Sequence, residues 1–411
     1  MSPLLATAVA VFVVTYLLIS YQNLPGVHIH RPAAALLGAA AMVVFGVLRL
    51  DQAYRLVDLD TLVFILGMMI VIGYLEVSGF FLQVEGLILT RAKSPRQLLW
   101  LLVWSSGLLS ALFMNDTICL MLTPLVLRVV KKAKLPPAPY LIALATASNI
   151  GSVMTPIGNP QNMIIAVHSG IPFTSFVAAL LPVSLAGLWL DYTVICRLYR
   201  KELPAGATLA LEPAAPLPRS RMLYVCLAST GLLLALFIAN VHPPLAALGV
   251  AALLILAGAR RPREAFRHID WELLLMFAGL FVVMGGLRES GALETVFSRL
   301  AGLGASGDAA RMAAVSVSSA LVSNVVSNVP CVVFFSQLMP GLKAGPDLWL
   351  VLAMASTLAG NLTLIGSVAN LIVFESAKKE AHVGFREYCR AGTLPAAFLI
   401  AAGTLWLLWA L

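Results

Sequence analysis

One stretch of this chain occurs twice, each time inside a long apolar run. The first copy, ASNIGSVMTPIGNPQN, begins at Ala147 and ends at Asn162, and the second, ASTLAGNLTLIGSVAN, begins at Ala355 and ends at Asn370. The copies align without a gap, and most of the shared residues are small or polar. Such residues let a membrane helix unwind and offer backbone and side-chain groups to a solute. One copy could equally serve close helix packing, but two copies in corresponding places favour a binding site.

The composition places these runs in a membrane. Of the 411 residues, 60% are hydrophobic and 11% are charged, whereas about 25% of the residues of a soluble domain are charged. A helix needs about 17–25 apolar residues to cross a bilayer. We therefore expect ten spans, at residues 4–20, 33–49, 61–78, 138–168, 173–196, 222–240, 245–259, 271–288, 347–377 and 392–410.

Four stretches are expected to be irregular. Spans 138–168 and 347–377 carry the repeated motif in their middles, so each is predicted to be a broken helix. Two more stretches, 98–130 and 312–341, have polar interruptions and are either pairs of short spans or re-entrant hairpins. Lys and Arg gather in cytoplasmic loops, and basic residues flank 98–130 on both sides. With two hairpins and external termini, 21 Lys and Arg lie inside and six lie outside.

A wider repeat supports this layout. When the second half is aligned on the first with a constant offset, acidic, glycine and cysteine positions coincide: Asp58 with Asp270, Asp60 with Glu272, Gly67 with Gly279, Gly73 with Gly285, Gly79 with Gly291 and Cys119 with Cys331. The predicted fold is therefore an all-α membrane protein of two repeats, 1–199 and 221–411, with a cytoplasmic linker at 200–220. Each repeat holds five spans, an odd number, so the second is predicted to be inverted relative to the first.

Asp116 stands out in the first hairpin. It is the only carboxylate between Glu85 and Asp191, and long apolar stretches flank it. An ionisable residue at that depth costs several kcal/mol unless it is paired or hydrated, so it is a functional candidate by default. We expect Asp116 to carry a coupling proton. The alternative role is to cap a helix that begins at Thr117, and the two roles can coexist.

The predicted substrate site combines both hairpin tips with both copies of the motif. Its hydroxyl, amide and backbone groups can donate and accept hydrogen bonds. The expected residues are Asn115, Thr117, Ser148, Asn149, Thr155, Gly158, Asn159, Asn162, Ser327, Asn328, Thr363, Gly366, Ser367 and Asn370. The histidines and the five cysteines lack metal-ligand spacing. We expect no metal, no cofactor and no catalytic residues, and therefore no enzyme.

At these residues the chain resembles the ion-transporter superfamily of arsenite permeases, sodium/proton antiporters and citrate or dicarboxylate carriers. FMNDTICLMLTPLVL, residues 113–127, is similar to the permeases' first hairpin. ASNIGSVMTPIGNPQNMIIAVHSGI, residues 147–171, is similar to plant silicic-acid efflux transporters and their bacterial relatives. The resemblance implies a scaffold and a mobile region that carries both hairpins and both broken helices, and it allows a homodimer. The antiporters tend to have Asp where Asn159 stands, which argues against sodium coupling.

The chemistry of the predicted site favours a neutral solute. Amides, hydroxyls and one carboxylate, without an intramembrane Arg or Lys, suit arsenous or silicic acid better than a multivalent anion. We expect an inner-membrane transporter that exports such an acid in exchange for protons. Its partners would be a small inorganic solute and the lipid bilayer, without nucleic acid. The alternatives are a sodium- or proton-coupled carrier of a small anion such as a carboxylate, a sodium/proton antiporter, and a channel.

Overall fold

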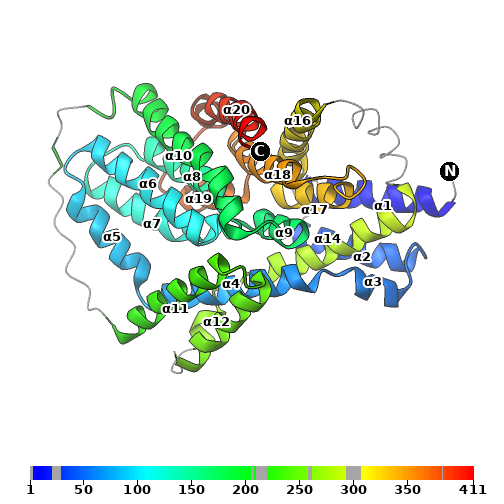
Figure 1. Ribbon diagram of the computed structural model, residues 1–411. Coiled ribbons are helices and arrows are strands. Elements are labelled where there is room, and N and C mark those ends of the chain that lie inside the picture. Colours follow the sequence, from blue (N-terminus) through cyan, green and yellow to red (C-terminus); the bar gives the residue numbers. More distant parts are fainter. Residues whose placement is uncertain are drawn as a thin grey trace.

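The computed structural model describes residues 3–20, 29–204, 208–209, 220–257, 262–292, 307–381 and 383–411, and these residues form helices without any strand (Figure 1). The predicted all-α class is confirmed. The first half contains α1 (Pro3–Ser20), α2 (Arg31–Val44), α3 (Leu50–Leu56), α4 (Leu59–Val77), α5 (Phe80–Arg91), α6 (Pro95–Leu112), α7 (Asn115–Lys132), α8 (Ala138–Ser152), α9 (Pro160–Ser169) and α10 (Phe173–Leu198). The second half contains α11 (Arg221–Ile238), α12 (Pro243–Ala257), α13 (Pro262–Phe266), α14 (Trp271–Glu289), α16 (Asp308–Val326), α17 (Asn328–Leu338), α18 (Pro346–Leu358), the 3₁₀ turn η1 (Ala359–Asn361), α19 (Val368–Ala377) and α20 (Phe385–Ala410).

Seven described helices are long and apolar enough to cross a membrane: α1, α4, α10, α11, α14, α16 and α20. The expected span 33–49 is shorter in the structure, as α2, and the expected span 245–259 begins two residues earlier, as α12. Helix α2 stops at Val44 because the chain turns at Gly46, whose φ of 72° favours glycine. Hydropathy missed this stop, since apolar Val47 and Leu48 follow it.

The four irregular stretches break where the polar residues predicted. The stretch 98–130 consists of α6 and α7, separated by residues 113–114, and the stretch 312–341 contains α16 and α17, separated at Ser327. Helix α16 starts four residues earlier than expected and is itself long enough to span. Helices α8 and α9 are separated by residues 153–159, and η1 with a short loop separates α18 from α19.

The two halves repeat the same elements. Helices α14 and α20 match α4 and α10 at both ends under the offset that aligns Asp58 with Asp270, and α19 matches α9 at both ends under the offset of the motif. Contacts between the halves are also matched, because α2 packs against α14 as α12 packs against α4, and α7 packs against α19 as α17 packs against α9. The inverted insertion of the second half stays a prediction. So does the linker 200–220, most of which lies outside the described residues.

Two matched glycines lie at close helix crossings. A Cβ on Gly67 of α4 would lie 2.8 Å from the backbone of Ala247 in α12, and one on Gly279 of α14 would lie 2.7 Å from the backbone of Ala35 in α2. Small residues at such crossings let backbones approach when hydrophobic exclusion from water does not drive helix association. The repeated glycines are therefore packing positions.

We predict that Gly67→Ala and Gly279→Ala each destabilise the protein by about 1–3 kcal/mol, because backbone atoms must move apart. Gly249→Ala in α12 is the matched control, since a Cβ there meets nothing within 4 Å. It should be neutral or stabilise by up to about 1 kcal/mol. Thermal unfolding of the three purified variants tests this. Equal stability of all three would show that neither crossing is tight.

Candidate functional site

The centre of the structure is the side chain of Asn149, near the end of α8. Its Oδ1 accepts hydrogen bonds from Asn115 Nδ2 and Ser367 Oγ, both at 3.0 Å. Its Nδ2 donates to Asn361 Oδ1 at 2.8 Å and to Asn370 Oδ1 at 3.0 Å. All five residues are buried. An amide has two acceptor lone pairs and two donor hydrogens, so Asn149 uses its full capacity on partners from the first hairpin and the second broken helix.

Each broken helix is closed by an asparagine of its own motif. Asn162 Nδ2 donates to the carbonyl oxygens of Ser152 and Thr155 at 3.1 and 3.0 Å. The matching Asn370 Nδ2 donates to the carbonyl oxygens of Gly360 and Thr363 at 2.7 and 3.3 Å. A helix break leaves carbonyl groups without helical partners, which is costly in a membrane. The spacing that both copies of the motif share therefore supplies the missing donors internally.

The start of α9 is fixed by Asn159. Its side-chain oxygen accepts from the backbone nitrogen of Asn162 at 2.8 Å, the bond expected of an N-cap residue. Its Nδ2 lies 2.9 Å from Ser152 Oγ and 3.3 Å from Thr357 Oγ1 of α18. Gln161 Nε2 also donates to Thr357 Oγ1, at 3.2 Å. Asn159 and Gln161 thus tie the first break to the second half.

The hairpin tips meet the two breaks. The backbone nitrogen of Asn115 donates to Gly158 O at 2.9 Å, and Thr155 Oγ1 donates to Ala111 O. In the second tip, the Asn328 amide is oriented with its nitrogen toward the Gly366 and Ser356 carbonyl oxygens, 3.0 and 3.2 Å away. Each tip is therefore seated on the broken helix of its own half.

Asp116 and Arg31 bring charge close to this centre. Asp116 is in the first turn of α7, whose N-cap residue is Met114, so the alternative role as a cap is wrong. Its carboxylate interacts electrostatically with Arg31 and with Asp270. Arg31 Nη1 donates to Ser327 Oγ at 3.5 Å, and its buried Nε has no hydrogen-bond partner among the described residues. The expectation of a site without an arginine is corrected, because the first turn of α2 carries Arg31 to the second hairpin tip.

Most of the predicted residues gather here, and a few do not. Ser148 turns toward Cys119, with 2.9 Å between Oγ and Sγ. Thr363 and Gly366 lie beside Asn324 in the second break, where Thr363 Oγ1 donates to Asn324 Oδ1 at 2.9 Å. Thr117 is partly buried and takes no part in the Asn149 network. These residues shape the breaks more than the centre.

Sequence reasoning missed Asn361, Thr357, Gln161, Tyr388 and Arg31. Asn361 had a signal, because the offset of the wider repeat, which aligns Asp58 with Asp270, also aligns Asn149 with Asn361. The offset that aligns the two copies of the motif pairs Asn149 with Thr357 instead. Asn149 and Asn361 share a hydrogen bond, so the two halves meet at these matched positions. Tyr388 had no such signal, since only the fold brings α20 to Asn370, whose Nδ2 lies 2.8 Å from the Tyr388 hydroxyl.

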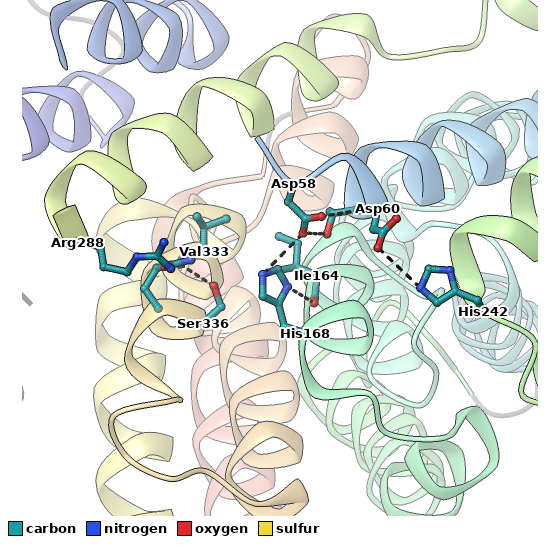
Figure 2. Close-up of polar contacts among 10 residues, drawn as sticks. Asp58, Asp60, Ile164, His168, His242, Arg288, Val333 and Ser336 are labelled. Atoms are coloured by element: carbon teal, nitrogen blue, oxygen red, sulfur yellow. Dashed lines mark hydrogen bonds and ion pairs between the residues drawn. The ribbon is translucent and has the colours of Figure 1, made fainter. Parts of the chain in front are cut away.

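A second polar group lies where α4, α9 and α12 meet (Figure 2). His168 Nε2 is 3.7 Å from Asp58 Oδ2, and His242 Nε2 is 3.8 Å from Asp60 Oδ2. A cavity of about 290 Å³ adjoins it and reaches from exposed His242 to Ile157 of the first break. The described residues hold no group of His, Cys, Asp and Glu suited to a metal. The cavity therefore links the surface to a break.

Ser327 has the most unusual backbone at the centre, with φ 78° and ψ 160°. Side chains other than glycine rarely adopt this region, at a cost of about 1–3 kcal/mol. We predict that Ser327→Gly is more stable than Ser327→Ala by about that amount, because both lose the hydroxyl and only glycine relieves the strain. Unfolding of the two variants measures the difference. Equal stabilities would mean that the serine backbone is relaxed.

Comparison with known proteins gives concordant results. A family model described as CitMHS, citrate transporter, matches residues 10–357. The silicon efflux transporter LSI3 of Oryza sativa subsp. japonica is 32% identical to this chain over 90% of the chain and 89% of the relative. A transporter named arsB in Dictyostelium discoideum is 25% identical over 95% of the chain and 90% of the relative.

A solved structure has the same general fold. The YdaH transporter of Alcanivorax borkumensis superimposes with a TM-score of 0.58 and 16% sequence identity, and the match covers 98% of each chain. At this identity the likeness concerns the fold alone. The sequence matches confirm the resemblance to the ion-transporter superfamily.

Proposed function

Because this chain belongs to the citrate transporter family of the ion-transporter superfamily, we propose that it is a secondary transporter that exports a small neutral metalloid acid in exchange for protons. The observation that carries this proposal is the amide centre around Asn149, to which both halves contribute. Arsenous and silicic acids carry several hydroxyl groups, each able to donate and accept, and amides complement them in both respects. Family membership makes the protein a multi-pass membrane transporter.

Unused polar groups at the centre suit such a solute. Asn115 Oδ1 and Arg31 Nε are buried and have no partner among the described residues. A buried polar group without a partner costs about 1–3 kcal/mol. A hydroxylated solute could donate to the Asn115 oxygen and accept from the arginine, which recovers both penalties. The name of the silicon efflux relative agrees with this chemistry.

A carboxylate substrate is the second candidate. It is favoured by one observation, the Arg31 guanidinium beside Ser327 of the second tip, since arginine pairs readily with carboxylates. The neighbouring Asp116 opposes it, because an ionised carboxylate there repels an anion. We therefore rank a neutral acid first, a small carboxylate second and sodium/proton exchange third.

The proposed setting is the inner membrane, with external termini, a cytoplasmic linker and the bilayer as partner. The distribution of Lys and Arg supports this orientation. In this orientation the cavity near His242 would open on the external face. Export would then pass from the centre through the first break to this cavity. We propose the proton as coupling ion, with sodium as the alternative, and a homodimer as the assembly.

The substrate is tested in proteoliposomes loaded with arsenous acid, silicic acid or citrate. We expect a proton gradient directed into the vesicles to drive arsenous or silicic acid out and to leave citrate untouched. Arg31→Gln is the informative variant, because it should abolish transport of an anion but only weaken transport of a neutral acid. Sodium-stimulated citrate transport that disappears in Arg31→Gln would replace the first proposal by the second.

Coupling is tested with Asp116→Asn, which preserves shape but cannot titrate. We expect proton-driven accumulation to fall at least tenfold per pH unit of gradient, the contribution of one proton. Exchange of labelled arsenous acid across the membrane should continue. Asp308→Asn is the matched control, because Asp308 is an exposed acid in the first turn of α16. Accumulation by Asp116→Asn equal to that of the control would exclude Asp116 as the proton carrier.

A further inference from the structure

Asp191 is a second carboxyl group inside the protein, in the long spanning helix α10. Its side chain is only 1% exposed, and Oδ2 meets no hydrogen-bonding group of the described residues. The Thr146 side chain of α8 is the neighbouring group that can hydrogen-bond this carboxyl group. An ionised carboxylate cannot be held at such a site without a cation or several donors. Asp191 is therefore built to hold a proton.

The Thr146 hydroxyl can pair with either form of Asp191. Its Oγ1 lies 2.8 Å from Ile142 O, to which it donates. A hydroxyl has one hydrogen to donate but two lone pairs, so Thr146 can accept from a protonated Asp191 at the same time. Loss of the proton would require Thr146 to turn its hydrogen from the helix carbonyl toward the carboxylate. The state of Asp191 thus changes the hydrogen bonding of α8, the helix that carries Asn149.

Two short paths join Asp191 to the centre. Through α8, the carbonyl oxygen of Thr146 accepts from Asn361 Nδ2 at 3.0 Å, and Asn361 in turn binds Asn149. Through α20, the carboxyl group interacts electrostatically with Tyr388, whose hydroxyl accepts from Asn370. Every residue of both paths is buried. The protonation state of Asp191 therefore affects two of the four residues that bind Asn149, namely Asn361 and Asn370.

The charged surroundings add no competing partner. Among the described residues, Tyr388 of α20 is the titratable group that interacts with Asp191, and Thr146 represents α8. Helix α6 brings Arg96 to Tyr192 and Cys196, on other faces of α10. Helices α11 and α18 also pack against α10. Neither helix has, among the described residues, a charged group that acts on the Asp191 carboxyl group.

The repeat marks Asp191 as a special position. The offset that aligns Asp58 with Asp270 also aligns Asp191 with Gly403 and Asp116 with Asn328. Carboxylates that serve the fold do occur at matched positions of both halves, since the N-cap residues Asp58 and Asp270 start α4 and α14. Both inner carboxyl groups instead occur in the first half alone. This asymmetry fits a task that is performed once per transport cycle.

We propose that Asp191 is a second proton-binding site, linked to the substrate centre through Thr146 and Tyr388. The inference rests on the proposed proton-coupled transport, and it adds a proton to the one assigned to Asp116. If two protons are exchanged for each neutral solute molecule, the concentration ratio of the solute across the membrane should reach the square of the proton concentration ratio. Each pH unit then contributes about 100-fold accumulation in place of about tenfold.

The first test measures accumulation of arsenous acid in proteoliposomes at a gradient of one pH unit, with the membrane potential clamped. We expect about 100-fold for the native protein and about tenfold for Asp191→Asn. Ser184→Ala is the matched control and should behave as the native protein. It removes another buried polar group from the same face of α10, two helical turns away, which likewise has no partner within the described part of the chain. Equal accumulation by native protein and Asp191→Asn would overturn the proposal.

The second test needs no transport, so it separates this inference from the proposed function. Infrared spectroscopy of the purified native protein should show a protonated carboxyl band that is absent from Asp191→Asn and shifted in Thr146→Val. If Asp191→Asn does not fold, the shift in Thr146→Val decides. A band unaffected by both changes would mean that Asp191 holds no proton. A native protein that carries the band but does not transport arsenous acid would refute the proposed substrate and retain the proton site.

Discussion

The four hydrogen bonds of the Asn149 amide are the interaction on which the centre depends. They join α7, the end of α8, η1 and α19 at one point. All four bonds join side chains, so the arrangement depends on the identity of these residues. An aspartate at 149 would lose both donors, and a leucine would leave four partners unsatisfied in a buried place. The position thus links the two halves more stringently than any apolar contact could.

The repeat explains why so much of the fold was predictable. Apolar length placed the long helices, and polar interruptions located the breaks to within a few residues, because both signals arise from the local cost of peptide groups in a membrane. Helix ends were harder to predict from the sequence. The stop of α2 at Val44 depends on one glycine turn, and α3 and α13 are short helices without a strong periodic signal.

The candidate site was predictable in its residue types and less so in its partners. Sequence symmetry pointed to Asn115, Asn149 and Asn370, and the structure brings them together. It could not reveal Arg31 or Tyr388, because each comes from an element distant in sequence and neither residue is repeated: Pro243 and Phe176 stand at the matching positions. Charge counting treated Arg31 as a loop residue, whereas the folded chain turns it inward to Ser327. Contacts that break the symmetry are the ones a repeat cannot foretell.

The self-contained closure of each broken helix has a consequence for movement. Asn162 and Asn370 each pair two carbonyl groups of a break from within its own motif. The hairpin tip of the same half pairs another, through Asn115 at Gly158 O and through Asn328 at Gly366 O, so break and tip form one unit. Such a unit can change its depth in the bilayer as one piece, with its irregular backbone still paired. The energy of sliding is then set by its outer surface and by the charges it carries. A spanning helix that must be discontinuous in order to bind can in this way remain easy to displace.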